Sequence, residues 1–419
     1  MLLFVLTTRR AAFSRMLVCR CTRSLDRGER ANRGGAVSHT ICGYSNCVAM
    51  TRIALICLVF ATARVAAQEQ DGSTTHKTLR NGVVMPTIAA GTGGYDNDNQ
   101  QGKVLRNGLV MPTMSAGTWQ YDDDEAEASV QAALTSGFRH IDTAYDYGNQ
   151  AGVSKGLAAG AAAAKLARKD IFVTTKVPGC GINGVDPKDC EGSTLSYLQK
   201  DYALLNSSYD LQGHVDLVLL HFPPCLVGKD GMTLCNANKK ISCTECDAIK
   251  QQWSAAVKAY EKGMFSAIGV SNYCTQCLQC LKDFKTQPMV NQFQLHVGMG
   301  PDPQGFLAMN AARGIVSQAY SPIGSGGHGS SDILSGPLTT KIAKAHNKST
   351  AQVALKYLVQ LNAAVVTKSS SPEHLKQDVE LFDWSLTRRD MKELAAATFA
   401  SDDTPSFECD NPSPATAMA

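Results

Sequence analysis

The chain has 419 residues, and 44% of them are hydrophobic, so it is long enough to bury a sizeable core. Its formal net charge of +3 is unevenly distributed, because residues 1–67 hold ten arginines and two acidic residues, whereas the rest holds 30 basic and 35 acidic residues. Since the rest shows neither a basic stripe nor an aromatic platform, we expect no nucleic-acid partner.

The first 67 residues have the composition of a leader. The segment from Met50 has a basic start at Arg52, continues with an apolar run and ends with small residues at Ala66 and Ala67. This pattern predicts a cleavable secretory signal that is too short to span a bilayer as a helix. We therefore expect export and no stable membrane insertion after cleavage. Residues 1–49 are also compatible with a mitochondrial-type extension or with sequence upstream of the true start, which would leave the protein in an organelle or in the cytoplasm.

An internal repeat follows the leader. The segment LRNGVVMPTIAAGTGGYDND from Leu79 recurs as LRNGLVMPTMSAGTWQYDDD from Leu105. Each copy has Asn-Gly where a hairpin turn would form, and a strand-like run comes next. Only the second copy continues directly into the later strands. We therefore interpret 68–104 as a duplicated, poorly ordered hairpin or linker, 105–400 as the folded domain and 401–419 as a flexible tail.

Eight apolar runs of strand character alternate with helical patterns in the folded domain. The runs begin at Pro112, Gly137, Asp170, Val215, Ser266, Pro288, Gly314 and Ala363. They are nearly continuous in apolar and β-branched residues, as expected of parallel strands buried on both faces. Helices are predicted over 125–135, 249–261 and 339–360. The alternation predicts an α/β fold, a (β/α)8 TIM barrel with an amino-terminal β-hairpin.

Four polar side chains stand at or just past the ends of these strands: Asp142, Tyr147, Lys176 and His221. Barrels of this type carry their chemistry at the carboxyl ends of the strands. Reducing a carbonyl needs a proton for the developing alkoxide, and a phenol with an ordinary pKa of about 10 releases it poorly near neutral pH. We predict Tyr147 as the acid and Lys176 as an ammonium that lowers its pKa. Asp142 would keep Lys176 charged, and His221 would donate a hydrogen bond to the substrate oxygen.

The motifs around these residues resemble those of the aldo-keto reductase superfamily. The matching segments are GFRHIDTAYDYGNQ, TTKV, LLHFP, IGVSN, NQ and AYSPIG, in that order between Leu105 and Met391. The resemblance implies an oxidoreductase that reduces aldehydes or ketones with NADPH. The alternative is a cofactor-binding sensor or regulatory subunit with little turnover. The complete set of four polar side chains favours the enzyme.

The resemblance also implies the residues that bind the nicotinamide end of the cofactor. These are Ser271, Asn272 and Gln292 on the carboxamide, with Tyr320 stacked on the ring. The Gly-rich segment GSGGHG from Gly324 follows the seventh strand and would fold over the pyrophosphate, with Ser321, Ile323 and Ser325 among the cofactor contacts. A plain mobile loop is the alternative for this segment. No Gly-rich dinucleotide fingerprint follows a first strand, so a Rossmann domain is excluded.

The segment after the last strand resembles the adenosine-phosphate segment of the family. Lys368 and Ser369 match the pair that contacts the 2′-phosphate, but His374 stands where an arginine is usual. Gln377 and Asp378 occupy the positions that approach adenine. Because histidine is mostly neutral at pH 7 and lacks the guanidinium fork, one phosphate contact is weakened. We expect NADPH as the cofactor, with NADH possible.

The resemblance implies an apolar, aromatic substrate pocket. Trp119, Tyr145 and Phe222 would line it beside His221, although Phe222 is equally compatible with the core. The short Pro- and Ser-rich tail supplies no recognisable element for a steroid or a sugar. We therefore expect small aldehydes and ketones as substrates. We also expect the protein to be a monomer.

Ten cysteines follow the leader, an even number that favours disulfides in an exported protein. Nine lie on the segments after the third, fourth and fifth strands, and Cys409 lies in a tail that could reach them. The cysteines are therefore expected around the mouth of the predicted site. Cys180–Cys190 and Cys225–Cys235 are the expected local disulfides.

Zinc binding is the alternative use of these cysteines. Cys243 and Cys246, and again Cys274 and Cys277, have the spacing of paired zinc ligands. A helix and a strand are predicted between the two pairs, and the remaining cysteines would be left over. We therefore favour disulfides and predict no metal site.

Overall fold

The computed structural model describes residues 77–78, 84–85, 102–224, 240–241, 246–324, 330–398 and 408–409. The chain divides into two units, residues 1–86 and 87–419. The expected secretory signal, the upstream extension and the disorder expected for most of the first repeat lie outside the described residues. Within the described part of the chain, no helix combines the length and the apolar character needed to cross a membrane.

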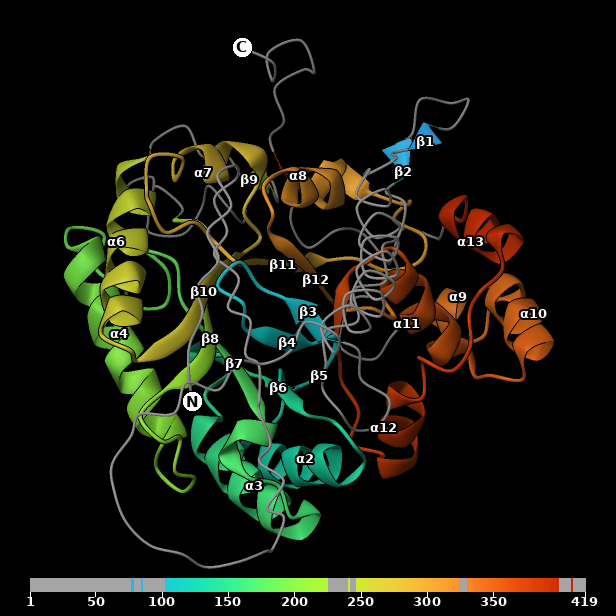
Figure 1. The fold of residues 1–419 in the computed structure, drawn as a ribbon, viewed down its shortest axis with the longest axis horizontal. Coiled ribbons are helices and arrows are strands. Elements are labelled where there is room, and N and C mark those ends of the chain that lie inside the picture. Colours follow the sequence, from blue (N-terminus) through green and yellow to red (C-terminus); the bar gives the residue numbers. More distant parts are fainter. Residues whose placement is uncertain are drawn as a thin grey trace, which may run out of the picture. The chain divides into compact units, whose positions relative to one another are not determined.

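A closed barrel of eight parallel strands forms the centre of the second unit (Figure 1). Its strands are β5 (Met114–Gly117), β6 (His140–Asp142), β7 (Phe172–Val177), β8 (Val215–Leu220), β10 (Phe265–Ser271), β11 (Val290–Gln294), β12 (Val316–Tyr320) and β13 (Ala364–Thr367). They follow one another around the barrel in chain order, and β13 closes it by pairing with β5. All eight predicted strands are therefore present, and the predicted TIM barrel is confirmed.

Helices surround the barrel on its outer side (Figure 1). They are α2 (Asp123–Thr135), α3 (Gln150–Ala164), α4 (Cys190–Leu205), α6 (Asp247–Glu261), α7 (Thr275–Gln279), α8 (Phe306–Ala312), α9 (Ser331–Leu334), α10 (Pro337–His346), α11 (Thr350–Gln360), α12 (Pro372–Val379) and α13 (Arg388–Ala395). The described residues also form the short 3-10 helices η1 (Tyr145–Tyr147), η2 (Arg168–Asp170) and η3 (Pro303–Gly305). The main core lies between strands and helices and includes Trp253, Tyr273 and Tyr357, which are fully buried.

The segment predicted as one helix over 339–360 is two helices. Asn347 has a left-handed backbone with φ 53° and ends α10, and the Ser349 side chain then accepts a hydrogen bond from the Gln352 amide to begin α11. The Gln352 side chain reciprocates by accepting from the Ser349 backbone, which completes a capping box. The prediction of a continuous helix was wrong because apolar periodicity outweighed these local stop and start signals.

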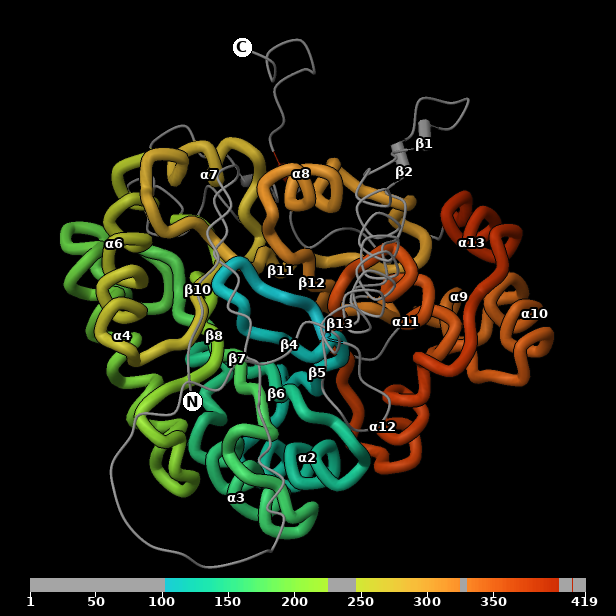
Figure 2. The backbone as a smooth tube through the Cα atoms, viewed as in Figure 1, coloured from blue at the N-terminus to red at the C-terminus, as the bar shows by residue number. Residues whose placement is uncertain are grey.

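The predicted hairpin closes the amino-terminal end of the barrel (Figure 2). Strands β3 (Gly102–Val104) and β4 (Val110–Pro112) are antiparallel, and the turn contains Gly108 with a φ of 87° that favours glycine. Leu105 and Met111 are buried against the first residues of the barrel strands. The hairpin begins at Gly102, three residues before the boundary expected from the resemblance.

The first copy of the repeat contains the same pairing. In the first unit β1 (Lys77–Thr78) is antiparallel to β2 (Val84–Met85), with Lys77 opposite Met85. In the second copy Lys103 is opposite Met111, so the two hairpins share their register at an offset of 26 residues. The redundancy of the first copy remains a prediction.

Three disulfides join described cysteines: Cys180–Cys190, Cys246–Cys280 and Cys274–Cys409. Cys277 is disulfide-bonded as well. The first pair is the predicted local disulfide, whereas Cys225, Cys235 and Cys243 lie outside the described residues. Because Cys246, Cys274 and Cys277 are all oxidised, these proposed zinc ligands are engaged in covalent bonds. The tail reaches the barrel, since Cys409 in β14 (Glu408–Cys409) bonds Cys274, and β14 pairs with β9 (Lys240–Ile241).

Candidate active site

The four predicted catalytic side chains meet at the carboxyl ends of the strands. Asp142 ends β6, Lys176 lies one residue before the end of β7, His221 follows β8, and Tyr147 ends η1. Parallel strands of a barrel present these ends at one rim. A cavity of about 520 Å³ opens there, with Asp142, Tyr147 and His221 in its lining. Its volume is in the range of small-molecule sites.

Lys176 is the fully buried centre of this group. Its Nζ donates to Asp142 Oδ1 at 2.5 Å, to the Thr143 backbone oxygen at 2.9 Å and to the Tyr147 hydroxyl at 3.3 Å. Three donors therefore meet three acceptors, which satisfies the ammonium without water. The second carboxylate oxygen of Asp142 accepts from Gln292 Nε2 at 2.8 Å. The ion pair is thus held from both sides.

The electrostatics of Lys176 and Tyr147 differ in part from the expectation. Burial is the largest influence on the pKa of Lys176 and lowers it, but Asp142 and Tyr147 together outweigh burial, so the pKa is raised and the ammonium is retained. Burial raises the pKa of Tyr147, and the nearby Lys176 charge offsets this only in part. The predicted lowering effect of the ammonium is therefore present, but desolvation outweighs it and the net pKa of Tyr147 is raised. Tyr147 is a protonated phenol at neutral pH.

His221 is fixed by neighbours that the sequence did not suggest. Its Nδ1 lies 3.2 Å from Asp146 Oδ2, and its ring stacks on Phe222 with 4.4 Å between centroids. The Asn272 side chain donates to its backbone oxygen at 3.1 Å. Burial lowers the pKa of His221, although the hydrogen bond to Asp146 acts in the opposite direction. Asp146 was missed because it lies between Tyr145 and Tyr147 in a segment in which only the phenols suggested chemistry.

The residues expected to hold the nicotinamide form one polar network. Tyr320 donates through its hydroxyl to Asn272 Oδ1 at 3.0 Å, and Asn272 donates to Ser271 Oγ at 3.1 Å. Ser271 donates in turn to the backbone oxygen of Gln292 at 3.0 Å. Asn272, Gln292 and Tyr320 line the cavity, whereas Ser271 is buried behind them. Gln318 was not predicted, and its Oε1 accepts from Gln292 Nε2 at 2.9 Å.

The Gly-rich segment contributes to the cavity at its start. Ser321 and Ile323 line the cavity together with Pro322 and Gly324. Ser321 has a left-handed backbone with φ 51°, so the chain turns sharply immediately after β12. Ser325 and the next four residues lie outside the described part of the chain.

The adenosine-phosphate segment is only partly brought to the cavity. Lys368 lines the cavity, and its Nζ donates to the Trp119 backbone oxygen at 3.0 Å. The Oγ of Ser369 accepts from the Ser371 amide at 3.1 Å. His374 is exposed in the first turn of α12. These three residues follow β13 in succession, so they lie at the same rim.

Gln377 and Asp378 lie further along α12. The backbone oxygen of Gln377 accepts from Gln352 Nε2 at 2.9 Å, and its side chain is directed to Glu373. Asp378 is buried, and its Oδ2 accepts from Thr367 Oγ1 at 2.9 Å. Burial raises the pKa of Asp378 to about 7. Asp378 therefore anchors α12 to β13, and neither residue lines the cavity.

Two of the three expected pocket aromatics line the cavity. Trp119 and Phe222 are part of the lining, and Trp119 is 43% exposed. Tyr145 is not, because its ring packs edge-on against Tyr197 of α4 at 5.0 Å. The phenol of Tyr197 donates to the Asn183 backbone oxygen at 3.0 Å.

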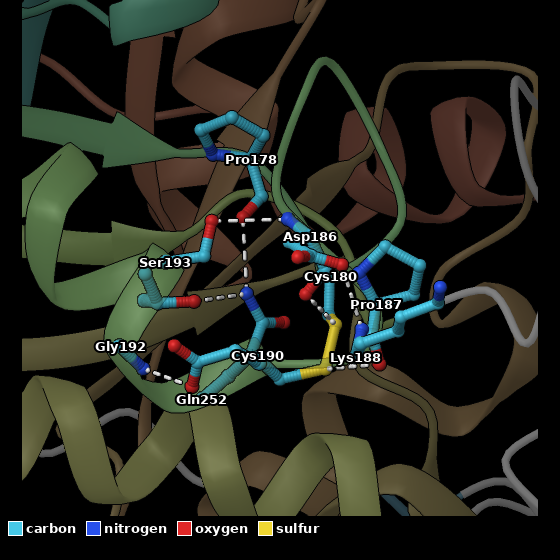
Figure 3. Close-up of a disulfide and its surroundings, with 11 residues drawn as sticks. Pro178, Cys180, Asp186, Pro187, Lys188, Cys190, Gly192, Ser193 and Gln252 are labelled. Carbon is cyan, nitrogen blue, oxygen red and sulfur yellow. Dashed lines mark hydrogen bonds between the residues drawn. A yellow bond between two sulfur atoms is a disulfide. The ribbon is translucent and has the colours of Figure 1, made fainter.

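The loop after β7 supplies Asn183, a further cavity residue that the sequence did not reveal. Figure 3 shows how the Cys180–Cys190 disulfide closes this loop onto the start of α4. Ser193 of α4 accepts from the Asp186 amide at 3.0 Å, and Gln252 donates to the Pro178 oxygen at 3.1 Å. The loop is therefore fixed at both ends where it approaches the cavity.

Known proteins are similar to this chain in sequence and in fold. The model of the Aldo/keto reductase family matches residues 109–398. An aldo-keto reductase of Mycolicibacterium vanbaalenii is 35% identical over 271 residues, which cover 64% of this chain and 82% of that protein. The morphine 6-dehydrogenase of Pseudomonas putida is 32% identical over 276 residues, with 64% and 81% covered. The crystal structure of a Bombyx mori aldo-keto reductase in complex with NADP has a TM-score of 0.59 at 25% identity and covers 71% of this chain and 93% of that one.

A closed parallel barrel with a buried acid–base cluster facing a cavity at the carboxyl ends of its strands defines a TIM-barrel enzyme. The family match spans more than half of the chain. The chain therefore belongs to the aldo-keto reductase family, as the sequence motifs implied. It is an NAD(P)H-dependent oxidoreductase of carbonyl compounds.

The Cys180–Cys190 and Cys246–Cys280 disulfides should have separable effects. By loop-closure entropy, removing Cys180–Cys190, with a sequence separation of 10, costs about 3 kcal/mol, and removing Cys246–Cys280, with a separation of 34, costs about 4 kcal/mol. The first closes the short loop that carries the cavity residue Asn183, whereas the second joins the N-cap of α6 to the C-cap of α7, and neither cap lines the cavity. We expect the Cys180→Ser/Cys190→Ser variant to raise the KM for aldehydes several-fold, and the Cys246→Ser/Cys280→Ser variant to lower Tm more while leaving KM unchanged. Equal KM changes in both variants would contradict the positioning role of the loop.

Proposed function

We propose that the protein reduces small aldehydes or ketones to alcohols with NADPH and that Tyr147 is the general acid. The observation that carries this proposal is the chain of contacts from Asp142 through Lys176 to Tyr147, with Lys176 Nζ 3.3 Å from the Tyr147 hydroxyl. A buried phenol beside a buried ammonium is an acid whose conjugate base is stabilised at the moment it forms. Both Asp142 and Tyr147 line the cavity.

The residues around the cavity fit a reduced nicotinamide cofactor. Amide side chains of Asn272 and Gln292 and the phenol of Tyr320 lie in the lining as members of one polar network, and Lys368 adds a cation to the lining. Asn272, Gln292 and Tyr320 would hold the nicotinamide, and Lys368 would meet the 2′-phosphate. When bound, this cofactor supplies the hydride that the carbonyl carbon accepts.

The protein's own residues would manage the proton and the orientation of the carbonyl. Because its pKa is raised, Tyr147 carries its proton at neutral pH and is ready to give it to the carbonyl oxygen as negative charge develops there. Lys176 would stabilise the tyrosinate that remains. Asp142 keeps Lys176 charged and fixes its direction through the 2.5 Å contact. His221 would donate a hydrogen bond to the same carbonyl oxygen and orient it.

We propose a pocket suited to small, apolar carbonyl compounds. Trp119 and Phe222 give the cavity aromatic walls, and Asn183 adds a polar group from the disulfide-closed loop.

We further propose that the mature protein is an exported monomer. Its disulfides are typical of an oxidising compartment.

The alternative is a cofactor-binding sensor or regulatory subunit with little turnover. Such a protein needs the cavity and the residues that would bind the cofactor, but it does not need a proton donor beside an ammonium. The two functions differ in a direct assay, which follows NADPH consumption with a panel of aldehydes and ketones. Binding of NADPH without consumption by any carbonyl would favour the sensor.

Replacing Tyr147 by Phe should abolish reduction and leave the Kd for NADPH within a few-fold. The proton donor is lost, whereas the residues proposed to bind the cofactor are unchanged. The matched control is Tyr145→Phe, because Tyr145 lies in the same 3-10 helix but contacts Tyr197 instead of Lys176. Steady-state kinetics should give near-normal turnover for this control. If Tyr147→Phe keeps most of its turnover, Tyr147 is not the acid.

Replacing Lys368 by Met should weaken NADPH far more than NADH. A charge-assisted phosphate contact contributes about 1.5–3 kcal/mol, so the Kd for NADPH should rise by about 10- to 150-fold. Fluorescence quenching measures both dissociation constants. The control is Lys376→Met, which removes an exposed lysine of α12 that does not line the cavity. Equal losses of both cofactors in Lys368→Met would show that the 2′-phosphate is not bound there.

A further inference from the structure

Asp146 is a carboxylate at the cavity for which the proposed reaction gives no role. Its side chain is 9% exposed, and Asp146 is part of the cavity lining. Oδ2 lies 3.2 Å from His221 Nδ1, while Oδ1 is buried without a hydrogen-bond partner among the described residues. A buried carboxylate with a single partner binds that partner strongly. Asp146 therefore acts on His221.

The chemistry of this contact fixes a proton. A carboxylate can only accept hydrogen bonds, so the contact requires a hydrogen on His221 Nδ1. A neutral imidazole carries one hydrogen, and Nε2 is then a bare acceptor. A bare nitrogen repels the lone pairs of a carbonyl oxygen. His221 can therefore donate from Nε2 to a carbonyl only when both nitrogens are protonated.

We propose that Asp146 is a positioning residue that holds His221 in the Nδ1-protonated tautomer, so that His221 donates to the carbonyl oxygen of the substrate only as an imidazolium. The inference rests on the proposed function, because it gives His221 a donor role in carbonyl reduction. If His221 donates only as an imidazolium, the rate of carbonyl reduction depends on pH through the Asp146–His221 pair.

The surroundings of His221 set the direction of this dependence. Four ionisable groups act on its ring: Asp142, Asp146, Tyr147 and Lys176. Burial lowers the pKa of His221 most strongly and Lys176 lowers it further, whereas the two carboxylates raise it without restoring it. The ordinary pKa of histidine is about 6.5, so the imidazolium is a minority at pH 7 and grows as the pH falls. The kcat/KM for reduction should accordingly rise on acidification.

Two other groups near the site must be separated from His221. Tyr147 contributes no step between pH 5.5 and 8.5 because burial raises its pKa above the ordinary phenol value of about 10. Asp201 of α4 is different, because burial raises its pKa to about 7 and it interacts electrostatically with Asp146. It does not contact His221, and its carboxylate accepts from Gln150. Asp201→Asn is therefore the matched control, since it removes a buried carboxylate without changing the partner of His221.

The kinetic test compares pH profiles of kcat/KM for one aldehyde. Above the pKa of His221, the wild-type protein should lose about tenfold per pH unit, because only the imidazolium donates. In Asp146→Asn the amide can donate to a bare Nδ1, and in Asp146→Leu the partner is absent, so Nε2 is free to carry the hydrogen. Both variants should change by less than about twofold per pH unit. Asp201→Asn should keep the wild-type slope. A wild-type slope in both Asp146 variants would overturn the inference.

The spectroscopic test does not depend on turnover. Long-range 1H–15N spectra distinguish the tautomers, and the signals of His221 are identified among the nine histidines by their loss in His221→Gln. At pH 8 the wild-type protein should show hydrogen on Nδ1, and Asp146→Leu should show it on Nε2. Hydrogen on Nε2 in the wild-type protein would overturn the inference. If Asp146→Leu does not fold, the nearly isosteric Asp146→Asn replaces it in this test, and its His221 should likewise show hydrogen on Nε2. If the wild-type protein reduces no carbonyl, the proposed function fails and these spectra alone decide the tautomer.

Discussion

The buried ion pair between Lys176 and Asp142 is the constraint on which the site depends. A fully buried ammonium is costly to desolvate, and its charge is retained only if every donor finds an acceptor. Lys176 meets this condition with Asp142, the Thr143 backbone oxygen and the Tyr147 hydroxyl. Because Asp142 is also held by Gln292, the pair ties β6, β7, η1 and β11 together. Removing one partner of such a pair typically costs about 3–5 kcal/mol.

The barrel makes this arrangement possible and leaves one rim for chemistry. Its parallel strands bring residues far apart in the sequence to the same end, and the β3–β4 hairpin buries Leu105 and Met111 at the opposite end. Around the site, the disulfides join segments outside the barrel strands. Cys180–Cys190 closes the loop that carries Asn183, and Cys274–Cys409 attaches the tail two residues after Asn272. The geometry of the acid–base cluster therefore comes from strands, whereas the shape of the cavity depends on cross-linked loops.

Much of this was predictable from the sequence, because strands buried on both faces give apolar runs that are hard to mistake. The polar residues at their ends also stood out, and Asp142, Tyr147, Lys176 and His221 do meet at one rim. What failed depends on three-dimensional contacts. The side-chain direction of Tyr145 is set by Tyr197, and the burial of Asp378 is set by Thr367.

Other features have no local signal in the sequence. Cys274 and Cys409 are 135 residues apart, so their pairing could not be chosen among the possible connectivities. The net shift of the Tyr147 pKa depends on the balance between desolvation and the Lys176 charge, which only the packed structure fixes. The role of Asp146 could not be predicted from the sequence, because its partner His221 is distant in the chain and only the fold brings the two side chains together. By contrast, the break between α10 and α11 could have been predicted from the sequence, because Asn347 is a typical helix C-cap and Ser349 a typical N-cap.

The central claim is that Asp142, Lys176 and Tyr147 act as one unit in carbonyl reduction. It is tested most directly by a double-mutant cycle on kcat/KM with Asp142→Asn, Lys176→Met and the double variant, at a temperature where all are folded. If the residues act as a unit, the double variant should lose no more than about threefold beyond the more damaged single variant, because either substitution already disables the acid. Losses that multiply would show that Asp142 and Lys176 contribute independently and would contradict the account.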